Sequence, residues 1–308
     1  MRRDILIIKN SKSISILSIT SLLFITGACA SGEGGAEGND EAAASIGEET
    51  DYEIIGIDPG TGIMENADEA IEVYELEEEW SVVSSSGPVM TAELGNAIED
   101  EEPVIVTGWQ PHWKFIEFDL KFLEDPEGVF GEGNDIHTMA RLGLEEDLPG
   151  VYQLFDQFEW EMSEMEEVMV MAEEEDTEVE EAARQWIEEN EELVAEWTDG
   201  IEEGDGQEVE LTLVNWADAV AATNVVSEVL QDLGYETNLV EVMIDAMYAG
   251  IADGSADAMF ASWLPAQQNY YDDYEEEIED LGPNTEGTRI GLVVPDYMDI
   301  ESIEDLQE

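Results

Sequence analysis

The chain has 308 residues, enough for two domains of ordinary size, and 43% of them are hydrophobic. It carries 79 acidic against 9 basic residues, a formal net charge of −70. Because like charges repel, this balance argues against nucleic acid and anionic membrane surfaces as partners. The acidic residues share their segments with Trp, Tyr, Leu and Val, which favours a folded protein with an acidic surface over a disordered acidic tail.

An acidic surface of this kind suits very salty surroundings. In dilute buffer the carboxylates repel one another and oppose the compact state. At molar salt the Debye length falls to about 3 Å, and most of that repulsion disappears. We therefore expect a protein adapted to high salt, as in halophiles.

The first 29 residues predict a lipoprotein signal peptide. Basic residues from Arg2 to Lys12 precede an apolar stretch at 14–28, which is too short for a comfortable membrane span. Small residues lead to Cys29, the sole cysteine, which we expect to carry a lipid anchor, with an incidental thiol as the alternative. Residues 30–51 are rich in Gly, Ala, Ser and acidic residues, which is typical of a flexible tether.

Short apolar runs alternate with helical patterns in the first half of the folded sequence. Strands are expected at about 54–57, 79–85 and 104–107, and helices from 63 onward and at about 90–98. Alternating strands and helices imply parallel pairing.

Residues 151–200 have a different pattern. Acidic positions alternate there with Leu, Met, Val, Ala and Trp at helical spacing, which predicts amphipathic helices. We interpret Trp160, Trp186 and Trp197 of this region as core packing and not as ligand contacts.

A second α/β unit follows this helical region. Strands are expected at about 209–214, 236–242, 258–261 and 290–294, and helices at about 222–233 and 245–253. In both halves the strands end in Gly, Pro or Trp. Ligands of open α/β sheets bind outside the carboxyl ends of the strands, so two such sheets facing each other predict a ligand cleft between them.

Three tryptophans directly follow short apolar strands: Trp109, Trp216 and Trp263. A tryptophan at a strand end is expected to project toward the cleft. A quaternary ammonium has no N–H to donate, but it can lie against indole faces, where each contact contributes about 0.5–2 kcal/mol. The pattern favours a cage for such a cation, with packing between the two halves as the alternative.

Residues 58–64 form a Gly-rich turn between a strand and a helix. Free backbone N–H groups at a helix N-terminus, aided by the helix dipole, suit an anion. A betaine carries a carboxylate opposite its ammonium, so this turn is a candidate for that end. The pattern alone is weak, because any tight turn can be Gly-rich.

Eight stretches, spread from residue 55 to residue 298, carry a family resemblance. They are IGIDPGTGIM (55–64), VIVTGWQPHW (104–113), DIHT (135–138), EWTDG (196–200), LVNWADAVAATN (213–224), VLQDLGY (229–235), GSADAMFASWLP (254–265) and GLVVPDYM (291–298). With these stretches the sequence resembles the glycine betaine-binding proteins of osmoprotectant ABC transporters.

The resemblance implies an α/β fold, the two-lobed periplasmic-binding-protein fold of type II. Each lobe would be a mainly parallel sheet flanked by helices, with the ligand cleft between the lobes. The order of the halves is similar to that of the permuted branch of the family. The first lobe would comprise 52–133 with a C-terminal tail at about 295–308, and the second lobe 134–294.

The resemblance also implies the residues of the site. Trp109, Trp216 and Trp263 would surround the trimethylammonium, and the backbone N–H groups of Gly62 and Ile63 would hold the carboxylate.

One position departs from the family pattern. Relatives often have a histidine five residues after the third tryptophan, and Gln268 stands at that place, where its amide can still donate without charge. His112 and His137 are interpreted as structural. None of the expected ligand groups titrates between pH 6 and 8, so little variation of affinity is expected over that range.

The expected function is capture of glycine betaine, or a related betaine such as proline betaine, for osmoprotection at the extracytoplasmic face of the membrane. The expected partners are this ligand, the permease subunits of an ABC importer, and the membrane through the lipid anchor. We expect no enzyme, cofactor or metal site, because the sequence has no clustered His, no GxGxxG after a strand and no EF-hand pattern. Binding of choline or another quaternary amine is the alternative, followed by a calcium-binding acidic lipoprotein.

Overall fold

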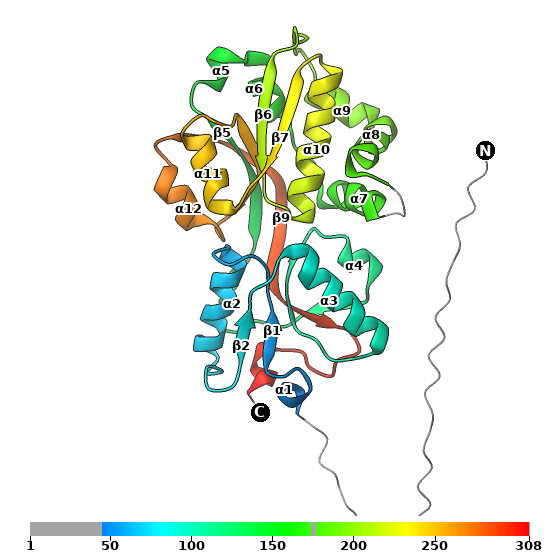
Figure 1. Ribbon diagram of the computed structural model, residues 1–308, viewed down its shortest axis with the longest axis vertical. Helices are drawn as coiled ribbons and strands as arrows, with labels where there is room; N and C mark the ends of the chain where they lie inside the picture. Colours follow the sequence, from blue (N-terminus) through cyan, green and yellow to red (C-terminus); the bar gives the residue numbers. More distant parts are fainter. Residues whose placement is uncertain (1–44, 174–176, 308) are drawn as a thin grey trace, which may run out of the picture. The chain divides into compact units, whose positions relative to one another are not determined.

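The computed structural model describes residues 45–173 and 177–307 (Figure 1). The expected signal peptide, Cys29 and most of the expected tether lie outside the described residues. The end of the tether segment is described, and it contains a short helix, α1 (Ile46–Glu49).

The first lobe contains a sheet built from the expected strands. Strands β1 (Glu53–Ile55), β2 (Ser81–Val83) and β3 (Val106–Gln110) pair in parallel in the order β2-β1-β3. Helices α2 (Gly62–Val73) and α3 (Gly87–Asp100) connect them and bury their apolar side chains in the core. The parallel pairing predicted from the alternation of strands and helices is confirmed.

The second lobe repeats this arrangement. Strands β6 (Glu208–Leu213), β7 (Glu236–Glu241) and β8 (Ala258–Leu264) pair in parallel in the order β7-β6-β8. Helices α10 (Ala217–Asp232) and α11 (Ile244–Ala252) connect them. Each lobe therefore orders its strands as second, first and third, which brings the carboxyl ends of the first and third strands together.

Further helices complete the two lobes around these sheets (Figure 1). They are α4 (Lys114–Glu117), α5 (Leu144–Asp147), α6 (Pro149–Gln157), α7 (Met162–Glu173), α8 (Val179–Glu189), α9 (Glu191–Trp197), α12 (Gln268–Tyr274) and the 3₁₀ helix η1 (Ile303–Leu306). Helices α6 to α9 confirm the helical pattern predicted for residues 151–200.

Two antiparallel strands, β5 (Asn134–Arg141) and β9 (Ile278–Pro295), join the lobes. The first part of β9 pairs with β5, and its residues 289–293 pair with β3. The sheet order is therefore β2-β1-β3-β9-β5-β8-β6-β7, with β4 (Leu120–Phe122) also paired to β9. In Figure 1, β9 runs between the two groups of elements.

Strands β4 and β5 were not predicted from the sequence, and β9 was expected only at its apolar end, 290–294. Before residue 290, β9 mixes Gly, Pro, Asn, Thr and charged residues in place of an apolar run, so this part gave no strand signal. Its last residues belong to the sheet of the first lobe, so the expected lobe boundary at 294 falls inside a strand that both lobes share.

The tryptophans of the helical region pack in the core, as predicted. The rings of Trp186 and Trp197 stack with their centroids 5.9 Å apart, and Trp160 meets Trp186 edge-on at 5.6 Å. Phe158 closes the group with its edge against Trp197, at 4.9 Å.

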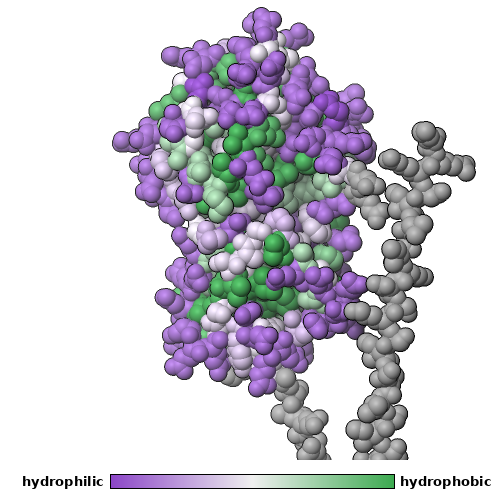
Figure 2. All heavy atoms as spheres, in the orientation of Figure 1, coloured by the Kyte–Doolittle hydropathy of each residue, from purple (hydrophilic) through white to green (hydrophobic). Residues whose placement is uncertain are grey.

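Basic residues are few among the described ones, and most are held in pairs. Lys121 contacts Glu301 at 2.8 Å, Arg141 contacts Asp257 at 2.7 Å, and Arg184 pairs with the buried Glu228. Hydrophilic residues cover most of the face shown in Figure 2. Within 45–173 and 177–307, no helix is long and apolar enough to cross a membrane, and no cluster of His, Cys, Asp or Glu is arranged to hold a metal ion.

We expect salt to stabilise this fold. Raising KCl from about 0.1 M to about 1 M shortens the Debye length from about 10 Å to about 3 Å, which screens repulsion between surface carboxylates. The melting temperature should rise by about 2–4 °C for each kcal/mol of repulsion removed. Thermal unfolding followed by circular dichroism measures this shift, with sucrose as the uncharged control. A melting temperature that salt does not raise more than sucrose would contradict the expectation.

Candidate functional site

A cavity of about 340 Å³, including its opening, lies where the strand ends of the two lobes meet. Both lobes and the connecting strand β9 contribute to its walls. The lining residues are Ile57, Thr61, Gly62, Ile63, Trp109, Trp216, Asp218, Trp263, Ala266, Gln267 and Ile290. The set contains five of the six residues expected at the ligand site, and Gln268 is the exception.

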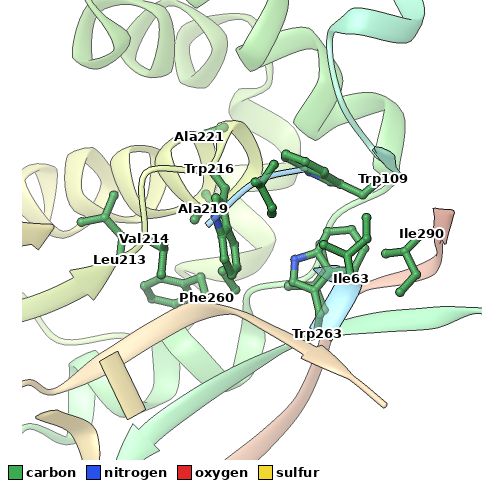
Figure 3. Packing of buried hydrophobic residues seen from close by; sticks show 14 of the residues in the cluster. Ile63, Trp109, Leu213, Val214, Trp216, Ala219, Ala221, Phe260, Trp263 and Ile290 are labelled. Carbon is green, nitrogen blue, oxygen red and sulfur yellow. The ribbon is translucent and has the colours of Figure 1, made fainter. Parts of the chain in front are cut away.

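The three tryptophans reach the cavity from three different strand ends. Trp109 belongs to β3, Trp263 to β8, and Trp216 is the N-cap residue that links β6 to α10. All three are at least 95% buried. Figure 3 shows their indole rings beside Ile63 and Ile290, around one common space. The structure thus brings together three residues that lie far apart in the sequence.

A buried carboxylate, missed by the sequence analysis, connects two of these rings. Asp218 lies in the first turn of α10, and its side chain accepts the indole N–H of Trp109 and that of Trp263, each at 3.0 Å. Burial raises the pKa of this carboxyl, while the indole donors and nearby Lys114 act in the opposite direction. The only sequence feature that could have indicated Asp218 is its position two residues after Trp216. In so acidic a sequence, that position does not distinguish it from other aspartates.

The N-terminus of α2 forms another part of the wall. Gly62 and Ile63 are its first two residues, so their N–H groups have no partner within the helix. The preceding Thr61 does not cap the helix, because its hydroxyl donates to the carbonyl oxygen of Asp58 at 3.0 Å. Within the described part of the chain, two N–H groups therefore remain available at the positive end of the helix dipole, beside the cavity.

Gln267, and not Gln268, lines the cavity. Gln268 is exposed, and its amide donates to Asp272 at 2.7 Å. Gln267 is 3% exposed, and its side-chain oxygen accepts the hydroxyl of Tyr248 at 3.0 Å. This bond leaves the amide N–H₂ group of Gln267 without a protein partner among the described residues. The family pattern points to the fifth residue after Trp263, so the preceding glutamine was not predicted.

Lys114 and His112 lie behind Trp109. Lys114 is completely buried, and its ammonium lies 4.1 Å from the centroid of the Trp109 ring. Burial lowers the pKa of Lys114 to about 7. His112 is also buried, and its Nδ1 accepts the backbone N–H of Lys114 at 3.1 Å. Of the two histidines interpreted as structural, His112 thus holds the local backbone, and His137 on β5 contacts Asp280 of β9 at 2.9 Å.

Contacts around the cavity hold the two lobes together. The hydroxyl of Tyr270, from the second lobe, donates to the carbonyl oxygen of Gly60 in the first at 2.7 Å. Gly62 packs so tightly against Ala266 that a Cβ at position 62 would overlap its carbonyl oxygen. Together with the bond from Trp109 to Asp218, these contacts describe a closed arrangement of the lobes.

Comparison with known proteins gives the family. Residues 37–189 and 207–308 match the model of the substrate-binding domain of ABC-type glycine betaine transport systems. The chain is 44% identical over 299 residues to the glycine betaine/carnitine transport binding protein GbuC of Listeria monocytogenes serotype 1/2a (strain 10403S), covering 96% of this chain and 98% of that protein.

Solved structures of similar proteins match over a shorter length. Lactococcal OpuAC, closed with glycine betaine, is 34% identical over 51% of this chain and 63% of its own, with a TM-score of 0.43. The glycine/betaine/L-proline-binding protein ProX of Borrelia burgdorferi is 34% identical over 52% of this chain and 63% of its own, with a TM-score of 0.47. From the family model and the near full-length relative, the chain belongs to the substrate-binding domains of ABC-type glycine betaine transport systems.

Proposed function

We propose that this protein captures glycine betaine, or a related betaine, outside the cell and delivers it to the permease of an ABC importer. Its place at the membrane would come from a lipid on Cys29. The single observation that carries the ligand assignment is a cavity in which three indoles face the N-terminus of a helix. A betaine has the matching pair of ends, a methylated cation and a carboxylate.

The indoles of Trp109, Trp216 and Trp263 would hold the trimethylammonium. This cation cannot donate a hydrogen bond, so it gains little from polar acceptors and much from aromatic faces. Their burial removes water that would otherwise weaken the electrostatic attraction.

Asp218 would support this cage in two ways. By accepting both indole N–H groups, it fixes the orientation of Trp109 and Trp263. In its ionised form it also places a negative charge at the cavity wall, which favours a cation there. We therefore assign Asp218 a positioning and electrostatic role next to the cage.

The opposite end of the ligand would meet hydrogen-bond donors. The N–H groups of Gly62 and Ile63 suit a carboxylate through both their direction and the helix dipole. The free amide N–H₂ of Gln267 is a third, uncharged donor. With Gln268 turned toward Asp272, Gln267 is the residue to which we assign the side-chain contact.

A panel of ligands tests the proposed function. Titration calorimetry in about 1 M KCl should give measurable affinity for glycine betaine and proline betaine, and at least about tenfold weaker affinity for choline. Choline lacks the carboxylate, so it would leave the N–H groups at the start of α2 without an anion. Equal affinity for choline would contradict the assignment of the carboxylate end, and no binding of any member would contradict the function itself.

Removing one wall of the cage should weaken binding. We expect Trp216→Ala to lower the affinity for glycine betaine at least about tenfold, or about 1.4 kcal/mol, since it removes a cation–π contact of up to about 2 kcal/mol together with the packing of a buried ring. Trp216→Phe, which keeps an aromatic face, should lose less. The matched control is Trp113→Phe, which alters a tryptophan outside the cavity and should keep the affinity of the original protein. A Trp216→Ala protein that folds and binds glycine betaine with the original affinity would contradict the proposed cage.

Closure of the lobes should depend on the absence of a side chain at position 62. Gly62→Ala places a methyl group against the carbonyl oxygen of Ala266, so it should oppose closure and lower the affinity at least about tenfold. The control Gly95→Ala adds a methyl group on α3 at an ordinary distance of 3.6 Å from Phe118 and should change neither affinity nor closure. X-ray scattering with and without ligand measures closure, and a compact Gly62→Ala complex of full affinity would argue against this role.

A further inference from the structure

A buried lysine covers the back of one cavity wall. The ammonium of Lys114 lies 4.1 Å from the centroid of the Trp109 ring and 5.6 Å from that of Phe115. Among residues 45–173 and 177–307, this ammonium has no hydrogen-bond partner. Lys114 does not line the cavity, although Trp109 does. One face of the indole is thus occupied, and a ligand in the cavity can stack only on the other.

We propose that Lys114 sets the affinity of the cage through Trp109: its charged form weakens binding of a cationic ligand, and its neutral form strengthens it. The inference rests on the proposed function, because it requires a positive charge of the ligand against Trp109. Cations at both faces would share the electron density of one ring and repel each other. Each cation would lie within about 6 Å of the ring centroid. At such distances inside a protein, repulsion between the Lys114 ammonium and the ligand cation lowers the affinity for the ligand on the order of tenfold.

Two titratable groups face Lys114 directly. Asp218 on α10 attracts the ammonium and favours its charged form. His112, in the loop before α4, accepts the backbone N–H of Lys114, and burial lowers the pKa of its ring well below the usual value, so it stays neutral near pH 7. Burial of Lys114 outweighs the attraction of Asp218 and brings its pKa to about 7.

The neighbouring elements carry two more charged groups. On α7, Glu166 reaches Gln110 at 3.5 Å, and burial raises the pKa of its carboxyl. On β9, the guanidinium of Arg289 lies 4.3 Å from the ring centroid of Phe122 and so has its own aromatic partner. Lys114 is therefore a group in contact with the cage whose charge changes near neutral pH, and Asp218, whose pKa burial also raises, is the other.

The sign of the effect follows from this charge. Below about pH 7 Lys114 is mostly protonated and opposes the ligand, and above it the neutral amine does not. Affinity should therefore rise with pH, in contrast to the flat profile expected from the sequence. Because coupling is reciprocal, the ligand should also expel the proton of Lys114 when it binds near pH 7.

Titration calorimetry of the whole protein with glycine betaine tests the proposal. It is carried out in about 1 M KCl, which screens surface charges more than buried ones. Affinity should be about tenfold higher near pH 8.5 than near pH 6. Near pH 7, buffers of different ionisation enthalpy should reveal release of a fraction of a proton. Lys114→Met, of similar length but uncharged, should bind equally at both pH values and release no proton.

Two further variants separate this effect from other causes. Lys114→Arg keeps the charge at every pH and should bind weakly throughout without a slope, whereas His137→Gln alters a histidine outside the cavity and should retain the slope. If Lys114→Met does not fold, two measurements still test the proposal: the proton release of the original protein and the pH dependence of the affinity of Lys114→Arg. The same pH slope in the original protein and in either Lys114 variant would overturn the proposal. No binding at any pH would instead contradict the proposed function.

Discussion

One buried carboxylate determines how the walls of the cavity meet. Asp218 accepts N–H groups from Trp109 of the first lobe and Trp263 of the second, so rings from both lobes converge on a single side chain. A buried carboxylate that lacks donors is strongly unfavourable, and rotation of either ring would remove one of the two indole donors of Asp218. The orientation of two aromatic walls therefore follows from the hydrogen-bond demand of Asp218, and the shape of the space beside Trp216 follows from them.

The same geometry relates ligand binding to the position of the lobes. Several contacts between the lobes lie around the cavity: Tyr270 with Gly60, Gly62 with Ala266, and Trp109 with Asp218. A ligand between the indoles and the start of α2 would touch both lobes and add its own contacts to these few. Since a ligand shifts a conformational equilibrium by its difference in affinity for the two states, a molecule that contacts both lobes favours the closed one.

The sequence predicted the parts of the site that depend on local pattern. Strand ends followed by a tryptophan identified Trp109, Trp216 and Trp263, and a Gly-rich turn before a helix identified residues 58–64. Within that turn, the family resemblance singled out Gly62 and Ile63. The rest depends on tertiary placement. Among 79 acidic residues nothing distinguishes Asp218, and only burial gives Lys114 its unusual charge behaviour. The choice between Gln267 and Gln268 depends on where α12 begins. The part of β9 before residue 290 escaped prediction because its pairing partners, not its composition, make it a strand.

The distribution of charge separates two physical regimes in this molecule. Outside, numerous carboxylates act over distances that salt shortens to a few ångströms, so their collective field reaches the cavity less as salinity rises. Inside, the buried Asp218 acts at the cavity wall and the buried Lys114 acts across Trp109, and burial preserves their influence under the same conditions. The proposed recognition of a cation by a few buried groups and aromatic faces would thereby be insulated from the ionic strength, and an osmolyte-binding protein has to function while that variable changes.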